Sequence, residues 1–409
     1  MQSRFYKSII IYIVKWLLIT FVLGFLGANL VLTLRIVIDS LRNFAEYTAV
    51  FTPLLGGAAV GLIIYYFDFR AEGLGTNRYI EYANKEKLIN DPGKLLVSKF
   101  SNTGLTLGLM GVEGIVGPIL LLGSSLASFL LQIIEEFQFN FLTKEHEYRV
   151  LNVCGAAAAL GPLLGAPIGS GVFASEVLYK SHLNYDDLFP AILASSFGYF
   201  FYNFFYKIPS LDYNIYLPHL APQGLILVII VALIAGLVGQ GIILIYNFSS
   251  NWFDSLSLSI ITKLILAGGA AALLIELFNI DNIVTKFKIE EIIFSGLSIK
   301  ILISLLLFKI LITILVVSSG GSVAMVDTAI LVGGLIGNLL HFILPLPLNS
   351  LVVVGMSAVL SSVANVPLAT IILIPEIFGV NLSLTIVLGS IIGFFIGRAQ
   401  TVYHYLDFG

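Results

Sequence analysis

One stretch of this sequence occurs twice, and the two copies constrain the fold more than any other feature. GAAAALGPLLGAPIGSGVFASEVL spans residues 155–178, and GMSAVLSSVANVPLATIILIPEIF spans residues 355–378. The copies share a proline (Pro167 and Pro367) and, nine positions later, a glutamate. Proline and a carboxylate are each costly inside an apolar helix, so composition does not explain their recurrence at one spacing. Two hydrophobic halves with interrupted helices indicate a transporter or channel whose site lies between the repeats.

The composition places the chain in a lipid bilayer. Of its 409 residues, 58% are hydrophobic and 11% are charged, whereas a soluble domain carries about 25% charged residues. Apolar stretches long enough to span or nearly span the hydrocarbon layer lie at 9–37, 53–66, 105–134, 225–246, 260–277, 301–317 and 382–396. Shorter, interrupted stretches at 156–165, 167–178, 352–363 and 367–374 predict helices that end inside the membrane. We therefore expect an all-α membrane protein.

A second internal match supports the division into halves. GIVGPILLLG (114–123) and AMVDTAILVG (324–333) align at an offset of 210, and Lys99 meets Lys309 at the same offset. We expect both lysines to extend to a membrane interface. A proline-containing stretch lies near the middle of the chain. The predicted domains are an N-terminal transmembrane repeat (1–208), a linker (209–222) and a C-terminal transmembrane repeat (223–409).

The polar residues argue against several classes of function. The net charge is −3 and no basic tract is present, which argues against nucleic-acid binding. No Ser/His/Asp set, Cys/His metal spacing or phosphate loop is evident, so we expect neither an enzyme nor a metal or cofactor site. The single cysteine, Cys154, is interpreted as a packing residue. Arg4, Lys7 and Lys15 predict an uncleaved first helix and a cytoplasmic N-terminus in the cell membrane.

Several motifs resemble those of the chloride channel/transporter (CLC) family. APIGSGVFASEVL (166–178) is similar to that family's Ala-Pro-Leu-x-Gly-x-x-Phe-x-x-Glu-Glu stretch. The family's anion-site motifs, Gly-Ser-Gly-Ile-Pro, Gly-Lys/Arg-Glu-Gly-Pro and Gly-x-Phe-x-Pro, correspond to Gly73-Leu74-Gly75-Thr76-Asn77, Gly114-Ile115-Val116-Gly117-Pro118 and Met325-Val326-Asp327-Thr328. A C-terminal tyrosine that completes the family's inner anion site matches Tyr403. The resemblance covers nearly the whole chain and is strongest over 99–178 and 311–405.

The resemblance implies two inverted-topology repeats of tilted, partly discontinuous helices. It also implies a homodimer with one pathway per subunit for chloride or a similar small anion, without the cytoplasmic CBS domains of some members. In such pathways the positive N-terminal ends of broken helices and their free N–H groups hold the anion. The implied pathway residues are Leu74, Gly75, Val116, Gly117, Pro118, Val326, Asp327, Thr328 and Tyr403.

The second motif can be aligned in two ways. If GVEG (111–114) is the motif, Glu113 is the gating glutamate. If GIVGP (114–118) is the motif, the Gly-Pro pair is kept and Val116 takes the gating position; we favour this alignment because it also keeps the family's flanking spacing. The family's internal proton glutamate corresponds to Val177. With both positions aliphatic, the resemblance implies passive conduction without obligatory proton exchange.

Other departures from the motifs concern the pathway itself. Leu74 and Val326 replace a serine and a phenylalanine of the family. With Val116 they predict an apolar constriction of the kind that gates by dewetting. Tyr403 either completes the anion site or is an aromatic residue of the membrane interface.

Four carboxylates within apolar stretches require an explanation. Asp327 either caps a helix or competes with the anion as a substitute gate. Glu113 is the other candidate substitute gate, and otherwise a helix-end or cavity-facing carboxylate. Glu176 and Glu376 are expected to accept hydrogen bonds that hold a helix end.

Three functions follow from these patterns. The favoured one is a passive anion channel. The second is a proton-coupled anion exchanger that uses Glu113 or Asp327 as a non-standard proton carrier. The third is a member of the family with an altered substrate or lost conduction. Proton movement driven by an anion gradient distinguishes the second function from the first.

Overall fold

A computed structural model describes residues 2–46, 51–86, 88–136, 145–180, 183–206, 217–218, 221–278, 294, 296–398, 400–403 and 405. Over these residues the protein is helical and contains no strand, so the all-α prediction is confirmed. The elements are α1 (Gln2–Glu46), α2 (Thr52–Tyr66), the 3₁₀ turn η1 (Phe69–Ala71), α3 (Thr76–Asn84), α4 (Pro92–Leu109), α5 (Val116–Glu136), α6 (Glu145–Leu164), α7 (Pro167–Glu176), α8 (Tyr185–Tyr206), α9 (Pro222–Ser255), α10 (Ile260–Phe278), α13 (Ile299–Ser318), α14 (Met325–His341), α15 (Leu348–Ala364), α16 (Pro367–Phe378) and α17 (Leu384–Gly397).

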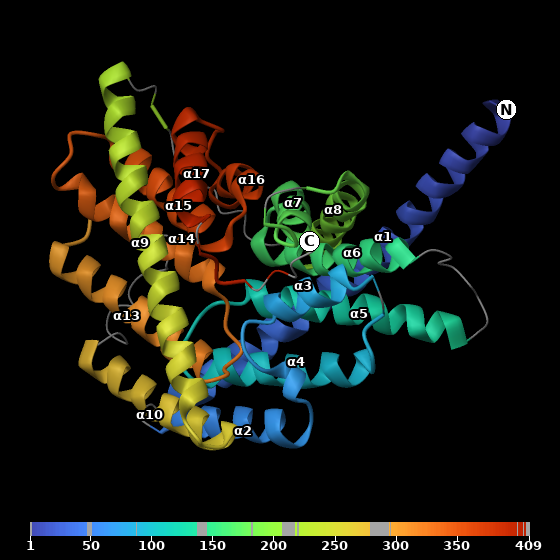
Figure 1. Cartoon of the computed structure of the whole chain (residues 1–409), viewed down its shortest axis with the longest axis horizontal. Helices are drawn as coiled ribbons and strands as arrows, with labels where there is room; N and C mark the ends of the chain where they lie inside the picture. The colour runs from blue at the N-terminus through green and yellow to red at the C-terminus, as the bar shows by residue number, and fades with distance from the viewer. Residues whose placement is uncertain are drawn as a thin grey trace.

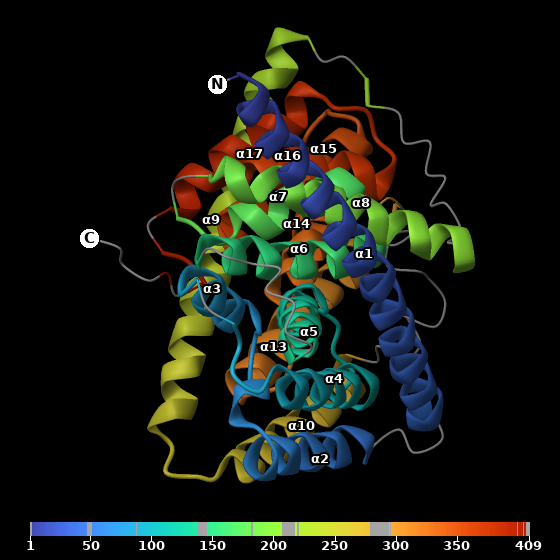
Figure 2. The same cartoon turned by 90° about the vertical axis from the view of Figure 1, so that its right-hand side faces the viewer.

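Six helices of the described chain are long and apolar enough to cross a bilayer: α1, α5, α8, α9, α10 and α13. Shorter apolar helices, among them α2 and α14 to α17, pack between them. In Figure 2, α9 runs along the left side and α1 crosses the right side, with α2 and α10 together at the bottom. The same pair lies side by side in Figure 1. These features make the protein an integral multi-pass membrane protein.

The apolar stretch 105–134 is not the single span that the sequence predicts. It is broken between the end of α4 at Leu109 and the start of α5 at Val116. Gly111 (φ +66°) and Gly114 (φ +143°) lie in this connector, in backbone conformations that other residues rarely adopt. The break leaves the first N–H groups of α5 without partners in their own helix.

The two halves pack their central helices in the same way. Gly123 of α5 faces Gly155 of α6 so closely that a Cβ on either glycine would overlap the carbonyl oxygen of the other. Gly333 of α14 and Gly355 of α15 make the corresponding contact in the second half. Small residues allow helix backbones to touch and are common where membrane helices associate. The internal matches seen in the sequence are thus matching helix pairs in the structure.

The repeated glutamates connect the two halves. Glu176, at the end of α7, accepts hydrogen bonds from the N–H groups of Leu368 (3.0 Å) and Ala369 (2.6 Å) at the start of α16. Glu376 of α16 in turn accepts hydrogen bonds from Ile168 and Gly169 at the start of α7, the shorter at 2.7 Å. The prediction that these carboxylates hold a helix end is confirmed. Each one holds the helix of the opposite half.

The predicted linker at 209–222 falls largely outside the described residues. α8 ends at Tyr206 before it, and α9 begins at Pro222 after it. The limits of the two domains therefore remain a prediction.

Lys99 fixes the loop that leads into α3. Its ammonium group is completely buried and donates hydrogen bonds to the carbonyl oxygens of Ala71 (2.9 Å) and Gly73 (2.7 Å). The amide of Asn102, one turn further along α4, donates to Ala71 as well (2.7 Å). The expectation that Lys99 extends to a membrane interface is wrong, because the buried loop carbonyls attract its charge inward.

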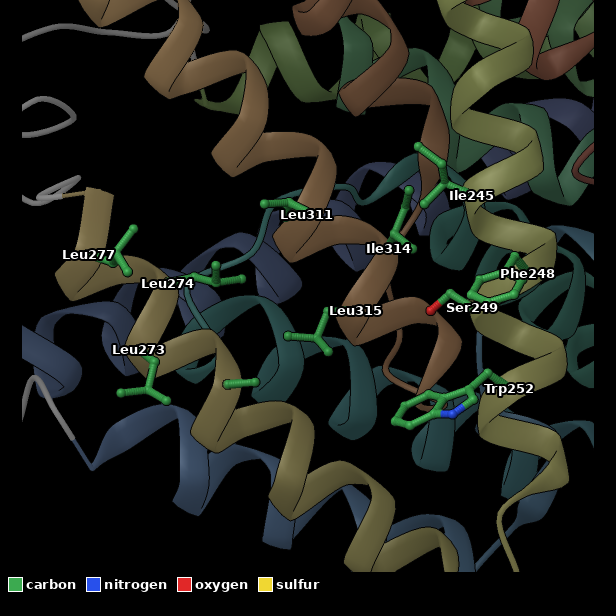
Figure 3. Close-up of a pocket in the computed structure, with 11 residues that line it drawn as sticks. Ile245, Phe248, Ser249, Trp252, Leu273, Leu274, Leu277, Leu311, Ile314 and Leu315 are labelled. Atoms are coloured by element: carbon green, nitrogen blue, oxygen red, sulfur yellow. The ribbon is translucent and has the colours of Figure 1, made fainter.

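A groove of about 520 Å³ lies between α9, α10 and α13. Figure 3 shows its lining, which includes Trp252 of α9, Leu273 of α10 and Leu311 of α13. The lining is apolar apart from Ser249 and contains none of the predicted pathway residues. Two residues further along α13 than Leu311, on a different face of the helix, Thr313 bonds to Thr328 of α14. α13 thus separates this groove from the interior.

Replacing Gly123 with alanine should destabilise the protein. The added Cβ would force α5 and α6 apart at a contact between backbones, at a cost of about 1–3 kcal/mol. Thermal unfolding of the purified protein in detergent measures the effect. Gly241→Ala in α9, where a Cβ meets no atom within 4 Å, is the matched control and should leave the melting temperature unchanged or slightly raised. Equal melting temperatures for the two variants would contradict the argument.

Replacing Lys99 with methionine should also lower the melting temperature. The change removes a donor from the carbonyl oxygens of Ala71 and Gly73, and an unsatisfied buried acceptor costs about 1–3 kcal/mol. Lys94→Met, at an exposed position of the same helix, is the control. If both variants unfold at the same temperature, Lys99 does not stabilise the loop.

Candidate functional site

The N-termini of three helices meet around Gly117, in the first turn of α5. A Cβ on Gly117 would lie 2.7 Å from the hydroxyl of Thr76, the first residue of α3, and 3.4 Å from the Cβ of Ala324, which precedes α14. It would also overlap the carbonyl oxygen of Leu74. The N–H of Ala324 donates to the carbonyl of Gly114 at 2.8 Å, which joins the start of α14 to the start of α5. Positive helix ends that converge in this way favour a bound negative charge.

The sequence allows this close approach because a glycine precedes α3. Gly75 has φ +79°, and a Cβ there would lie 2.9 Å from the carbonyl oxygen of Gly117. A larger residue would meet both a steric clash and backbone strain. The first motif, which contains Leu74 and Gly75, therefore packs directly against Gly117 of the second motif.

A negative charge already lies at the start of α5. Oδ2 of Asp327 accepts hydrogen bonds from the backbone N–H groups of Ile115 (3.0 Å) and Val116 (3.3 Å). The sequence left open whether Asp327 caps a helix or competes with an anion. These hydrogen bonds place its carboxylate on the helix of the other half, at donors that a bound anion would use.

The surroundings of this carboxylate are apolar. Leu74, Val116 and Val326 are all buried and belong to the same hydrophobic cluster. Pro118 is buried in the first turn of α5. Thr328 is buried too, and its hydroxyl is hydrogen-bonded to that of Thr313 at 3.0 Å. The polar groups at the start of α5 therefore include the backbone N–H groups of Ile115 and Val116, the Asp327 carboxylate and the Thr76 hydroxyl.

Tyr403 reaches the same place from the C-terminal end of the chain. It is 4% exposed, its phenol interacts with the side chain of Thr76, and it lies within electrostatic range of Asp327. Thr76 was not predicted as a site residue. Thr76 directly follows the Gly-Leu-Gly stretch of the first motif, and this position in the sequence could have identified it as a site residue. Leu74 offers no hydroxyl, whereas its neighbour Thr76 does.

Glu113 lies in the connector before α5 and is paired with two cations. Lys309 of α13 donates a hydrogen bond to its Oε2 at 3.0 Å, and a guanidinium nitrogen of Arg42 of α1 lies 3.8 Å from its Oε1. The expectation that Lys309 extends to a membrane interface is wrong, because the residue is 7% exposed and forms this ion pair with Glu113. Lys309 and Glu113 both lie within electrostatic range of Asp327. No pattern in the sequence points to Arg42.

Val177 lies elsewhere in the fold. It is buried directly after α7, and its N–H donates a hydrogen bond to the carbonyl oxygen of Phe173 at 3.0 Å. Its neighbour Glu176 bonds to α16. Within the described part of the chain, no three His, Cys, Asp or Glu side chains gather in a way that could hold a metal ion.

Sequence comparison supports the relationship suggested by the motifs. A family model for the voltage-gated chloride channel matches residues 6–140 and 56–398. An uncharacterized protein of Methanocaldococcus jannaschii is 26% identical over 404 residues, which cover 97% of this chain and 96% of that one. The voltage-gated ClC-type chloride channel ClcB of Shigella flexneri is 25% identical over 245 residues, or 59% of this chain and 56% of ClcB.

Solved structures share the fold. A CLC-type fluoride/proton antiporter superposes with a TM-score of 0.82 at 21% identity, covering 96% of this chain and 97% of its own. A slow cyanobacterial Cl⁻/H⁺ antiporter superposes with a TM-score of 0.75 at 19% identity, covering 94% of each chain. The expected architecture of inverted repeats with discontinuous helices is thereby confirmed. The chain belongs to the voltage-gated chloride channel (CLC) family, whose function is anion transport across membranes.

Proposed function

We propose that this protein conducts small anions such as chloride passively, along a path past the N-termini of α3, α5 and α14, and that Asp327 gates the path. One observation carries the proposal. The carboxylate of Asp327 is hydrogen-bonded to the first N–H groups of α5, through Ile115 and Val116. A carboxylate and a bound anion compete for the same donors, so the path is occupied while Asp327 stays there.

The competition is an exchange between similar interactions. Each hydrogen bond to a charged group contributes about 1.5–3 kcal/mol net. An incoming anion that accepts hydrogen bonds from the same N–H groups recovers most of the interaction free energy that is lost when the carboxylate leaves. The exchange therefore responds to anion concentration. A change of about 1.4 kcal/mol in the binding free energy of either the anion or the carboxylate shifts the ratio of the two bound states tenfold.

Two aliphatic residues argue for passive conduction. In the favoured alignment, Val116 and Val177 correspond to the glutamates of the family's exchangers, and neither valine can take up a proton. Leu74, Val116 and Val326 are buried apolar residues. In this proposal they line the path, and an anion passes them only when the path is wetted. Obligatory proton exchange would need a further carrier.

A proton-coupled exchanger is the second candidate. Asp327 is itself a titratable group at the proposed anion site, and the two solved structures described above are of antiporters. In this alternative, protonation releases Asp327 from α5 and each transport cycle carries a proton.

We also propose a homodimer with one pathway per subunit, in the cell membrane. The Glu376 carboxylate and its partner Ile168 lie on a partly exposed face of α7 and α16. A carboxylate is unfavourable against lipid, so a second copy is the suitable cover for this face. Arg4, Lys7 and Lys15 support a cytoplasmic N-terminus.

Replacing Asp327 with asparagine should raise anion flux. Asparagine lacks the charge that competes with the anion, and losing a charge-assisted interaction of about 1.5–3 kcal/mol predicts an increase of about tenfold or more. Chloride efflux from liposomes that contain the purified protein measures it. Asp39→Asn, at an exposed position of α1, is the matched control and should behave as wild type. Equal flux for Asp327→Asn and wild type would rule out the gate.

A pH electrode in the same assay tests proton coupling. We expect a chloride gradient to drive no proton movement through the wild-type protein, because Val116 and Val177 cannot carry protons. Uphill proton movement that disappears in Asp327→Asn would support the exchanger instead.

A further inference from the structure

We propose that Lys309 receives the Asp327 carboxylate when an anion displaces it from α5, and that Glu113 competes with Asp327 for this lysine. The proposal rests on the gate proposed above. It makes Lys309 a positioning residue for the gate, and it gives the ion pair beside the pathway a role in how readily an anion enters.

The connector before α5 brings Lys309 and Asp327 close together, because Lys309 bonds to Glu113 and Asp327 bonds to the N–H of Ile115, two residues further along. Thr313 lies four residues after Lys309 on α13, one turn along the same face, and Thr328 follows Asp327 on α14. The hydroxyls of these threonines are hydrogen-bonded at 3.0 Å. α13 and α14 thus touch close to both residues, and Lys309 and Asp327 interact electrostatically.

A displaced Asp327 carboxylate needs a partner. Its neighbours Val116 and Val326 are buried and apolar, and an unpaired carboxylate in such surroundings is strongly unfavourable. Among the described residues, the ammonium group of Lys309 is a cation close enough to Asp327 to interact with it electrostatically.

The charges around Glu113 allow the exchange. Arg42 and Lys309 carry two positive charges, and Glu113 and Asp327 carry two negative charges. In the structure Glu113 pairs with both Arg42 and Lys309, while Asp327 accepts hydrogen bonds from backbone N–H groups. If Lys309 turns to Asp327, Glu113 keeps Arg42, so each carboxylate retains one cation. The α5 N–H groups are then free for the anion.

Arg42 is held in place for this second arrangement. Its Nε donates a hydrogen bond to the carbonyl oxygen of Leu107 at 3.3 Å, which keeps the guanidinium beside Glu113. Lys309 has a long, flexible side chain with three donors, so it can change partner without a move of the backbone.

Double-mutant cycles in liposomes test the proposal. Lys309→Met and Glu113→Gln are each made in the wild-type and in the Asp327→Asn background, and chloride flux is measured over a range of chloride concentrations. In the wild-type background Lys309→Met should raise the half-saturating chloride concentration about tenfold, because the displaced carboxylate loses its partner. Glu113→Gln should lower that concentration, because Lys309 is released to Asp327. Lys309→Arg, which keeps the positive charge, should have a half-saturating concentration closer to that of wild type than Lys309→Met has.

In the Asp327→Asn background neither substitution should change the half-saturating concentration, because there is no carboxylate to receive. Lys300→Met, at an exposed position of α13, is the matched control and should match wild type in both backgrounds. If Lys309→Met fails to fold, judged by size-exclusion elution, the effect of Glu113→Gln in the two backgrounds decides the question.

Equal effects of Lys309→Met in both backgrounds would overturn the proposal, since the lysine would then act on the anion itself. A Glu113→Gln variant that raises the half-saturating concentration would also overturn it. These outcomes are distinct from a failure of the gate proposal itself. That proposal fails if the Asp327→Asn single variant has the same chloride flux as wild type.

Discussion

Helices that begin within a membrane protein leave their first backbone N–H groups without partners in their own helix, and the structure of this protein depends on how those groups are satisfied. The partners are carboxylates. Glu176 bonds to the start of α16, Glu376 to the start of α7, and Asp327 to the start of α5. In all three cases the carboxylate comes from one half of the chain and the helix from the other. One type of interaction therefore joins the repeats and forms the candidate site.

The three carboxylates differ in what surrounds them. Glu176 and Glu376 each use both oxygens on a helix that begins with proline, where the next N–H groups are free. Asp327 accepts hydrogen bonds from the start of α5 with one oxygen only, Oδ2, and the Lys309 ammonium group interacts electrostatically with it. The two glutamates are therefore suited to hold helices, whereas the proposed gate requires Asp327 to leave α5 for Lys309.

The sequence predicts the repeats, most of the membrane helices and the caps formed by Glu176 and Glu376, because these follow from local patterns at a fixed spacing. It does not predict the partners of Lys99 and Lys309, since the carbonyls and the carboxylate that attract them lie far away in the chain. The break between α4 and α5 is hidden in an apolar stretch, where Gly111, Glu113 and Gly114 are the residues that mark it. Which helix Asp327 caps depends on how the halves meet, and single-sequence patterns carry no such information.

The reciprocal caps of α7 and α16 also bear on how such a chain can arise. A half-length protein with one Gly…Pro…Glu element would carry a buried carboxylate and a proline-started helix with free N–H groups, and neither would have a partner. Two such proteins in opposite orientations would satisfy each other. A precursor of half this length is therefore complete only as a pair, and gene fusion of two copies preserves a contact that association had already formed.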